Sequence, residues 1–297
     1  MSPTAKSLIL DLLSTLHGGS MPVRALVLAG TLFDIAPNSI RVELARLVGR
    51  GLIESDERGS YRMARGAQSV QSRVVSWSRI EERMTSWTGG WVGVHTASLP
   101  RSDRRAARRR ERAFAFLGFR ELDTGLWIRP DNLSGGVAEV RRQLTALGLE
   151  PAAVVFALGA LDPATETRAR ALWDVAALRA GYRATRDAIL ASERRMPRLA
   201  PQKAMVESFT LGGRAIRQLV LDPLLPEPIL PSTERRALVQ TMRRYDKLGR
   251  ACWRAFMVDH GAPSRRSPVD LRTTTDLSIM SMVRDGAASA AVAGGTR

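Results

Sequence analysis

The sequence predicts an α+β protein with an N-terminal winged helix-turn-helix, a ferredoxin-like α/β middle domain and a helical C-terminal domain. Three helical patterns and a β-hairpin pattern occupy residues 1–66. A strand-helix-strand-strand-helix-strand order occupies 87–161, and only helical patterns occupy 162–260. Residues 67–86 lack Gly and Pro and predict a linking helix, whereas 261–297 are rich in Ser, Arg, Ala and Gly and predict a mostly disordered tail.

The N-terminal domain is predicted from apolar residues at helical spacing, followed by two short extended runs. Helices are expected over 4–17, over 23–29 with a turn at Gly30, and from Pro37 to Arg50. Strands are expected over 51–55 and 60–63, with a turn at Asp56-Glu57-Arg58-Gly59 between them. Three helices followed by a hairpin wing are typical of a winged helix-turn-helix.

The third helix is the element around which this domain is organised. Its apolar residues are Ile40, Leu44, Leu47 and Val48, and its opposite face carries Asn38, Val42, Ala45, Arg46 and Gly49. Pro37 suits the first helical turn, Asn38 or Ser39 is expected to hydrogen-bond free amides there, and Gly51 is placed to end the helix.

This face is polar or small and has few acids, so it predicts a recognition helix that lies against double-stranded DNA. Asn38, Val42 and Arg46 are expected to face base edges in the major groove, while the wing contacts backbone or minor groove. The candidate DNA-binding residues are Asn38, Ser39, Arg41, Val42, Arg46, Arg50, Arg58, Ser60 and Arg62.

The charge of the whole chain favours a polyanionic partner. The formal net charge is +16 and the isoelectric point is near 11.4. An Arg-rich, GC-biased proteome is an alternative cause of such a value. Residues 1–66 hold eight Lys/Arg and six Asp/Glu, so a winged helix used for protein contacts also stays open.

The middle and C-terminal domains are predicted element by element from the same periodicities. Strands are expected at 91–96, 119–122, 126–129 and 153–158, and helices at 102–116 and 133–147. Four further helices are expected at 165–180, 183–194, 203–220 and 233–259, and one short helix in the tail near 277–283. Pro223, Pro226, Pro228 and Pro231 form a rigid connector before the last long helix.

The first helix of the middle domain is unusually rich in arginine. It contains Arg101, Arg104, Arg105, Arg108, Arg109, Arg110 and Arg112. A solvated helix face and a phosphate-facing surface are equally open interpretations.

Catalytic and metal-binding signals are missing from the sequence. One cysteine, Cys252, excludes an intrachain disulfide and a cysteine-based zinc site, and the three histidines have no metal-ligand spacing. We therefore expect no cofactor and no metal. No run reaches transmembrane length and no signal peptide is recognisable, so we expect a cytoplasmic protein without membrane contact.

Several motifs together resemble the PaaX family, bacterial repressors of phenylacetate catabolism and their relatives. The segment from Ser39 to Ile53 is similar to the family's recognition helix. Trp87, Trp91, Gly118-Phe119, the arginine-rich helix and Leu126-Trp127-Ile128-Arg129-Pro130 resemble its middle domain. The C-terminal domain is represented by Trp173-Asp174, Tyr182, Asp222-Pro223-Leu224-Leu225-Pro226 and Ile229-Leu230-Pro231. Ser232-Thr233-Glu234 departs from the Trp-Pro-Gly step usual in the family.

The resemblance implies a dimeric repressor that an aryl-acetyl-CoA thioester releases from its operator. On that hypothesis, arginines would hydrogen-bond to the phosphates of the effector, and a tryptophan would pack against its acyl group. The candidate effector-binding residues are Arg105, Arg108, Arg109, Arg112, Trp127 and Trp173.

Two other classes of function remain as alternatives. A metal-dependent nuclease-like enzyme shares the ferredoxin-like order, but the strand Trp91-Val92-Gly93-Val94-His95-Thr96 carries no acid, so we expect no enzyme. A non-DNA-binding interaction protein with a degenerate winged helix is the second alternative.

Overall fold

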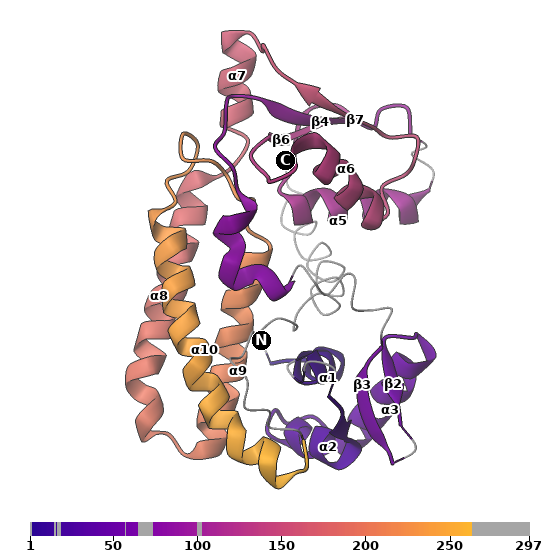
Figure 1. The fold of residues 1–297 in the computed structure, drawn as a ribbon, viewed down its shortest axis with the longest axis vertical. Helices are drawn as coiled ribbons and strands as arrows, with labels where there is room; N and C mark the ends of the chain where they lie inside the picture. Colours follow the sequence, from indigo (N-terminus) through magenta and orange to yellow (C-terminus); the bar gives the residue numbers. More distant parts are fainter. Residues whose placement is uncertain are drawn as a thin grey trace, which may run out of the picture. The chain divides into compact units, whose positions relative to one another are not determined.

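The computed structural model describes residues 2–14, 16, 19–56, 58–64, 74–99 and 103–262 (Figure 1). These residues form a mixed α and β structure with two small antiparallel sheets. The chain divides into two compact units, which are described separately. The first unit comprises Met1–Ser78, Thr185–Arg217 and Val239–Arg297; the second comprises Arg79–Ala184 and Gln218–Leu238. The predicted domain boundaries at residues 66, 86 and 161 stay a prediction.

The N-terminal part of the first unit contains three helices and three short strands. They are α1 (Ala5–Ser14), β1 (Met21–Pro22), α2 (Val23–Thr31), α3 (Pro37–Gly49), β2 (Ile53–Ser55) and β3 (Ser60–Met63). The sheet order is β1-β3-β2, with Met21 opposite Tyr61 and Ile53 opposite Met63. Strand β1 was not predicted, because two residues that end in a proline give no recognisable alternation.

A hydrophobic core holds these elements together. Leu8, Leu26, Ile40, Leu47 and Ile53 are all at most 1% exposed. The core continues into Met205 of α9 (Pro201–Val220) and Trp253 of α10 (Thr233–Asp259), which belong to the same unit. Side chains from both helices, which the sequence predicts within the helical C-terminal domain, thus contribute to this core.

The ends of α3 are set partly as the sequence predicts. Gly51 ends the helix with a left-handed φ of +66°, and the Leu52 amide donates to the Leu47 carbonyl at 3.0 Å. Pro37 lies in the first turn, as expected. The expected side-chain cap is absent, because the capping residue is Ala36; the exposed Asn38 and Ser39 are therefore not engaged in capping.

The second unit is built on a four-stranded sheet with two helices on one face (Figure 1). Its elements are β4 (Trp91–His95), α5 (Arg104–Leu117), β5 (Arg120–Asp123), β6 (Leu126–Pro130), α6 (Gly136–Ala146) and β7 (Val154–Leu158). The strand order is β5-β6-β4-β7, with Gly93 opposite both Ile128 and Phe156. Asp103 begins α5 by accepting hydrogen bonds from two backbone amides, and Gly118 ends it with φ +74°.

The boundary between the first two helices after the sheet differs from the prediction. They are α7 (Pro163–Arg170), α8 (Val175–Arg195), the 3₁₀ turn η3 (Met196–Arg198), α9 and α10. The expected helix over 165–180 stops at Arg170, because the Asp174 carboxylate accepts from the Ala177 amide at 2.8 Å and starts α8 anew. Gly181 was expected to separate two helices but lies inside α8, where a Cβ atom would be 3.1 Å from the Gln218 carboxamide nitrogen.

The predicted linking helix over 67–86 is corrected in its described part. Val74–Arg83 forms a 3₁₀ helix, η2, with non-helical angles at Arg79. Trp77 and Ile80 are buried three residues apart, and that spacing aligns side chains in a 3₁₀ helix. Residues 67–73 lie outside the described residues, as do residues 263–297 of the predicted tail over 261–297. None of the described helices is long and apolar enough to cross a bilayer.

Candidate nucleic-acid interface

Helix α3 divides sharply into a buried and an exposed face. Ile40, Leu44 and Leu47 are at most 1% exposed and anchor the helix in the core. The other face carries the residues predicted to contact DNA. Asn38, Ser39, Arg41, Val42, Arg46 and Arg50 are all exposed. The burial of one face therefore fixes which side chains are displayed on the other.

The hydrophobic pattern placed one residue on the wrong face. Val48 was expected to pack inward but is 39% exposed, and Val42 is 42% exposed. The two valines add apolar surface beside the arginines. Such contacts suit the methyl group of thymine.

The charge of the exposed face is positive. Glu43 is the one acidic residue in α3, and its carboxylate lies 3.6 Å from Arg46. The Arg46 side chain is 71% exposed, so this ion pair contributes little stability and leaves the guanidinium accessible to a competing anion.

A shallow hollow of about 340 Å³ lies between α3 and the start of α1. Asn38, Ser39, Val42 and Arg46 line one side, and Thr4, Ala5 and Lys6 line the other. Thr4 and Ser7 begin α1 with reciprocal hydrogen bonds of 2.9 and 3.1 Å between backbone amide and side-chain oxygen. The partial positive charge of a helix N-terminus thus adds to that of Arg46 and Lys6, which line the hollow.

Hydrogen bonds to Asp56 lie between β2 and β3. The Asp56 carboxylate accepts from the Arg58 amide at 3.0 Å and from the Ser60 amide at 2.8 Å, and Gly59 has φ +73°. The Arg58 side chain is exposed. Arg62 is engaged within the hairpin, because its guanidinium donates to Glu54 at 2.9 and 3.1 Å. Ser60 is half-buried opposite Pro22 of β1.

The candidate effector residues differ in how far their side chains are exposed. Arg105 and Arg108 are exposed on α5, and Arg109 is exposed with its Nε donating to the Gly148 carbonyl at 3.3 Å. Arg112 is half-buried. The helix carries six arginines against one glutamate, Glu111, so its exposed face is strongly basic.

The two candidate tryptophans lie against other aromatic rings. Trp173 is 4% exposed, its Nε1 donates to the Gly118 carbonyl at 3.0 Å, and its ring is stacked 6.2 Å from that of Trp91. Trp127 is half-buried with its ring 4.8 Å from Phe114. Trp173 is therefore a core residue of the second unit, which leaves it no open face for a ligand.

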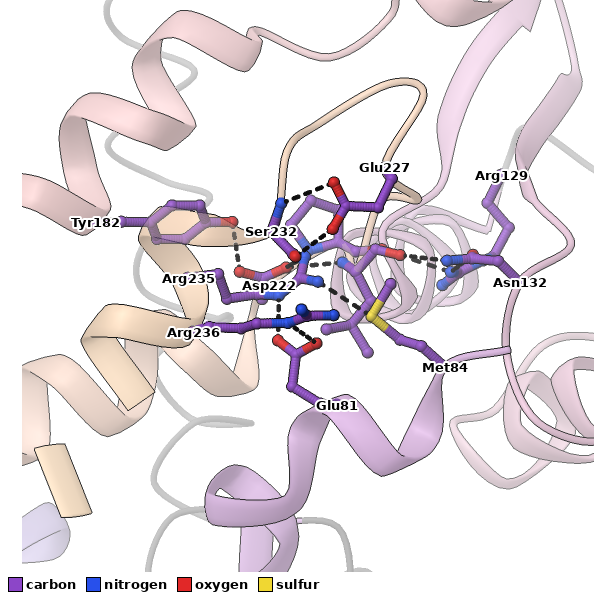
Figure 2. A network of polar contacts seen from close by, with 12 residues as sticks. Glu81, Met84, Arg129, Asn132, Tyr182, Asp222, Glu227, Ser232, Arg235 and Arg236 are labelled. Carbon is purple, nitrogen blue, oxygen red and sulfur yellow. Dashed lines mark hydrogen bonds and ion pairs between the residues drawn. The ribbon is translucent and has the colours of Figure 1, made fainter. Parts of the chain in front are cut away.

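The second unit contains a buried polar network, shown in Figure 2, that the sequence did not predict. Arg129 of β6 is 2% exposed and donates to the Pro130 carbonyl at 3.1 Å, the Asn132 carboxamide at 3.0 Å and the Pro223 carbonyl at 3.4 Å. It also donates to the Leu117 carbonyl. Burial lowers the pKa of the Arg129 guanidinium to about 9, and the nearby Arg83 charge acts in the same direction.

The second half of this network surrounds Asp222. Its carboxylate accepts from the Tyr182 hydroxyl at 2.5 Å and the Leu224 amide at 2.8 Å, and lies 3.8 Å from Arg235. Burial raises the pKa of the Asp222 carboxyl, although the Arg235 charge opposes that shift. Arg235 in turn donates to Glu81 at 2.8 Å. The contacts fix the Asp222–Pro226 loop, in which Leu224 has a left-handed φ of +51°.

No group of three or more potential metal ligands of the His, Cys, Asp and Glu types occurs in the described part of the chain. The buried network is enclosed by carbonyls and side chains of the same unit, so its geometry is that of a structural clamp. A charged residue in the apolar strand Leu126–Pro130 was the available signal for it, but no sequence pattern pairs residues so far apart.

Comparison with known proteins gives the architecture but no function. No protein family and no curated protein matches the sequence. Among solved structures, an uncharacterized protein, Rv0674, from Mycobacterium tuberculosis is similar, with a TM-score of 0.56 and 23% identity. The match covers 84% of this chain and 98% of that protein. At this identity the likeness shows a shared fold.

Proposed function

We propose that the protein is a DNA-binding transcriptional regulator. In this proposal α1–α3 and the β2–β3 hairpin form a winged helix-turn-helix, and α3 lies in the major groove. The observation that carries it is the division of α3: its apolar face is buried, and its exposed residues include Asn38, Arg41 and Arg46, with Glu43 as the one acid. The exposed Arg50 directly follows the helix. Asparagine and arginine are the side chains that read adenine and guanine edges.

The wing and the hollow beside α1 supply the backbone contacts in this proposal. Arg58 lies between β2 and β3 with its side chain exposed, and the N-terminus of α1 and Arg46 of α3 line the same hollow. Both features suit phosphate groups that flank a major groove. Arg62 would contribute less, because Glu54 already neutralises it.

The proposal also assigns a fold to the middle domain, a dimeric assembly and a class of effector. The sheet of the second unit would be a ferredoxin-like middle domain, since its order matches the split β-α-β arrangement. We propose a homodimer on a nearly palindromic operator, because one winged helix makes few base contacts. Following the PaaX resemblance, it would repress a catabolic operon, such as one for phenylacetate, and would respond to an acyl-CoA effector.

The test is selection of DNA from a random duplex library, followed by binding measurements at several salt concentrations. We expect enrichment of a sequence with two half-sites about one helical turn, or a multiple of it, apart. Light scattering should give the mass of a dimer. Recovery of no enriched sequence would reject DNA recognition, and a monomer both free and on DNA would reject the dimer.

A calorimetric titration with aryl- and alkyl-acyl-CoA esters tests the effector class. If no ester binds or changes operator affinity, the acyl-CoA assignment fails while the DNA-binding proposal stands. Replacement of Arg108 and Arg109 by Ala tests α5 directly, since loss of ester binding is expected only if this helix meets the phosphates.

A further inference from the structure

A groove of about 780 Å³ lies within the first unit, between the end of α2 and the exposed face of α9. Thr31 and Leu32 form its α2 side, and Arg195 and Leu199 lie at one end. Small-molecule sites have volumes of roughly 300–1,000 Å³. The groove is therefore large enough for a metabolite.

The floor of the groove is apolar. Leu32, Leu199, Val206 and Leu211 contribute to its lining, and all four are half-buried. Partial burial leaves part of each side chain open to the hollow. A ligand with an apolar group would remove this surface from water, at about 25 cal/mol per Å² of apolar area.

The rim of the groove is positively charged. Lys203 and Arg214 are exposed at the groove and form no ion pair with any described residue. The acid in the lining, Glu207, is already neutralised by Arg195 at 2.6 Å and accepts the Ser192 hydroxyl at 2.5 Å. The two remaining cations therefore favour an anion.

The groove adjoins the turn that leads to the recognition helix. Phe33 follows the lining residue Leu32 and packs against Phe209 of α9, with ring centroids 5.1 Å apart, and against Trp253 of α10 at 6.5 Å. The next residue, Asp34, has a left-handed φ of +57°, and the Ile35 amide donates to the Gly30 carbonyl at 3.0 Å. The turn from α2 to α3 is thus anchored to the helix that forms the floor of the groove.

We propose that this groove binds a small organic anion with an apolar body and that its occupancy changes DNA affinity. The coupling rests on the proposed function; the binding site does not. Cations and open apolar side chains occur together here, whereas Trp173, the apolar wall expected near α5, lies in the core. A ligand that contacts α2 and α9 together would act on the α2–α3 turn.

The experiment is calorimetric titration of the full chain with octyl phosphate, octanoate, octanol and inorganic phosphate. We expect octyl phosphate or octanoate to bind at least tenfold more tightly than octanol and inorganic phosphate. Octanol lacks the negative charge, and inorganic phosphate lacks the apolar chain. The stronger of the two anions identifies the preferred head group. If neither anion binds more tightly than octanol, the proposal is wrong.

Reversing the charges of Lys203 and Arg214 tests whether the anion binds in this groove. Lys203→Glu with Arg214→Glu should weaken binding at least tenfold, because both changes place a repulsive charge at the groove. Lys247→Glu with Arg254→Glu makes the same change in charge on α10, outside the groove lining, and should alter binding less than twofold. Equal losses in the two double variants would assign the effect to net charge and overturn the site.

Operator binding separates this inference from the proposed function. A saturating concentration of the bound anion should change the operator dissociation constant at least fivefold, and the Lys203→Glu/Arg214→Glu variant should not respond. If the anion binds but operator affinity is unchanged, the coupling is wrong. If the anion binds and no DNA sequence is recognised, the binding site stands and the proposed function fails.

Discussion

At the scale of single residues, Arg129 shows how a buried cation can be held without a direct ion pair. Its guanidinium donates to the Pro130 carbonyl of β6, to the carboxamide of Asn132 just after β6 and to the Pro223 carbonyl of the Asp222–Pro226 loop (Figure 2). Arginine suits this position because its planar group presents several donors in fixed directions. The contacts connect segments of one unit that are far apart in sequence.

Replacement of Arg129 by Met should lower the free energy of unfolding by about 3 kcal/mol. The substitution leaves several buried oxygens without donors, each at a cost of about 1–3 kcal/mol that relaxation reduces. Urea denaturation provides the measurement. Arg120→Met on the exposed neighbouring strand β5 is the matched control and should cost less than about 1 kcal/mol. Equal costs in the two variants would show that the buried network contributes no special stability.

Asp246 makes stability depend on pH. Burial raises the pKa of its carboxyl to about 6, although the Arg250 charge opposes the shift. A carboxyl with a raised folded-state pKa stabilises the fold fully below its unfolded pKa near 4, and this contribution is lost as the pH rises toward and past 6.

The Asp246→Asn variant isolates this effect. The quantity to follow is the difference in the free energy of unfolding, natural protein minus variant. This difference should fall by up to about 3 kcal/mol between pH 4 and pH 7. Urea denaturation across this range measures the difference. A difference that stays constant or rises with pH would contradict the raised pKa.

At the scale of elements, the close approach of α2 and α3 depends on Gly30. A Cβ atom at this position would lie 2.8 Å from Cγ1 of Ile40, which is itself fully buried. The sequence predicts a turn at Gly30, whereas the residue lies inside α2 and is needed for packing. A glycine signals conformational freedom and small size alike, so the sequence alone does not distinguish the two.

Gly30→Ala should therefore destabilise the protein by about 1–3 kcal/mol, as overpacking does. Gly213→Ala is the matched control within α9, because its Cβ meets nothing within 4 Å; it should stabilise by up to about 1 kcal/mol. Thermal or urea unfolding of both variants gives the comparison. A Gly30→Ala protein as stable as Gly213→Ala would show that the helices have room to separate.

Helices and strands were predictable where their apolar residues recur at a regular helical or strand spacing and are therefore buried on one face. The helix from Pro37, the strand over 60–63 and the helix over 233–259 agree closely with the structure, because each has a continuous amphipathic pattern or flanking turn residues. The break before α8 was not predictable from apolar spacing, since it depends on one capping contact of Asp174. The 3₁₀ form of η2 was missed for a similar reason: absence of Gly and Pro permits an α-helix without requiring one.

Sites were less predictable than elements. The exposed face of α3 follows from its periodicity, so the exposure of Asn38, Val42 and Arg46 could be anticipated. The burial of Trp173, a candidate effector residue, could not be anticipated, because it depends on Trp91 and Gly118, which are distant in sequence. The groove at Lys203 and Arg214 is formed by α2 and α9, so no local pattern marks it.

At the scale of the whole molecule, most of the basic residues lie outside the segment that carries the proposed DNA-reading residues. The chain has a net charge of +16, yet its first 66 residues hold eight basic and six acidic side chains. We infer that specificity arises from a few residues on α3, while much of the general attraction for DNA comes from arginines elsewhere. These two contributions respond differently to mutation and to salt.

The central claim is that the exposed face of α3 reads DNA bases, and operator binding by Arg46→Ala tests it most directly. Asn38→Ala and Arg58→Ala are measured beside it, against the selected operator and against single-base variants. Arg46→Ala and Asn38→Ala should each lose about 1–3 kcal/mol of discrimination at one base position. Arg58→Ala, as a backbone contact, should weaken all sequences alike and reduce the salt slope by about one. If Arg46→Ala binds and discriminates as the natural protein does, the recognition face assigned to α3 is wrong.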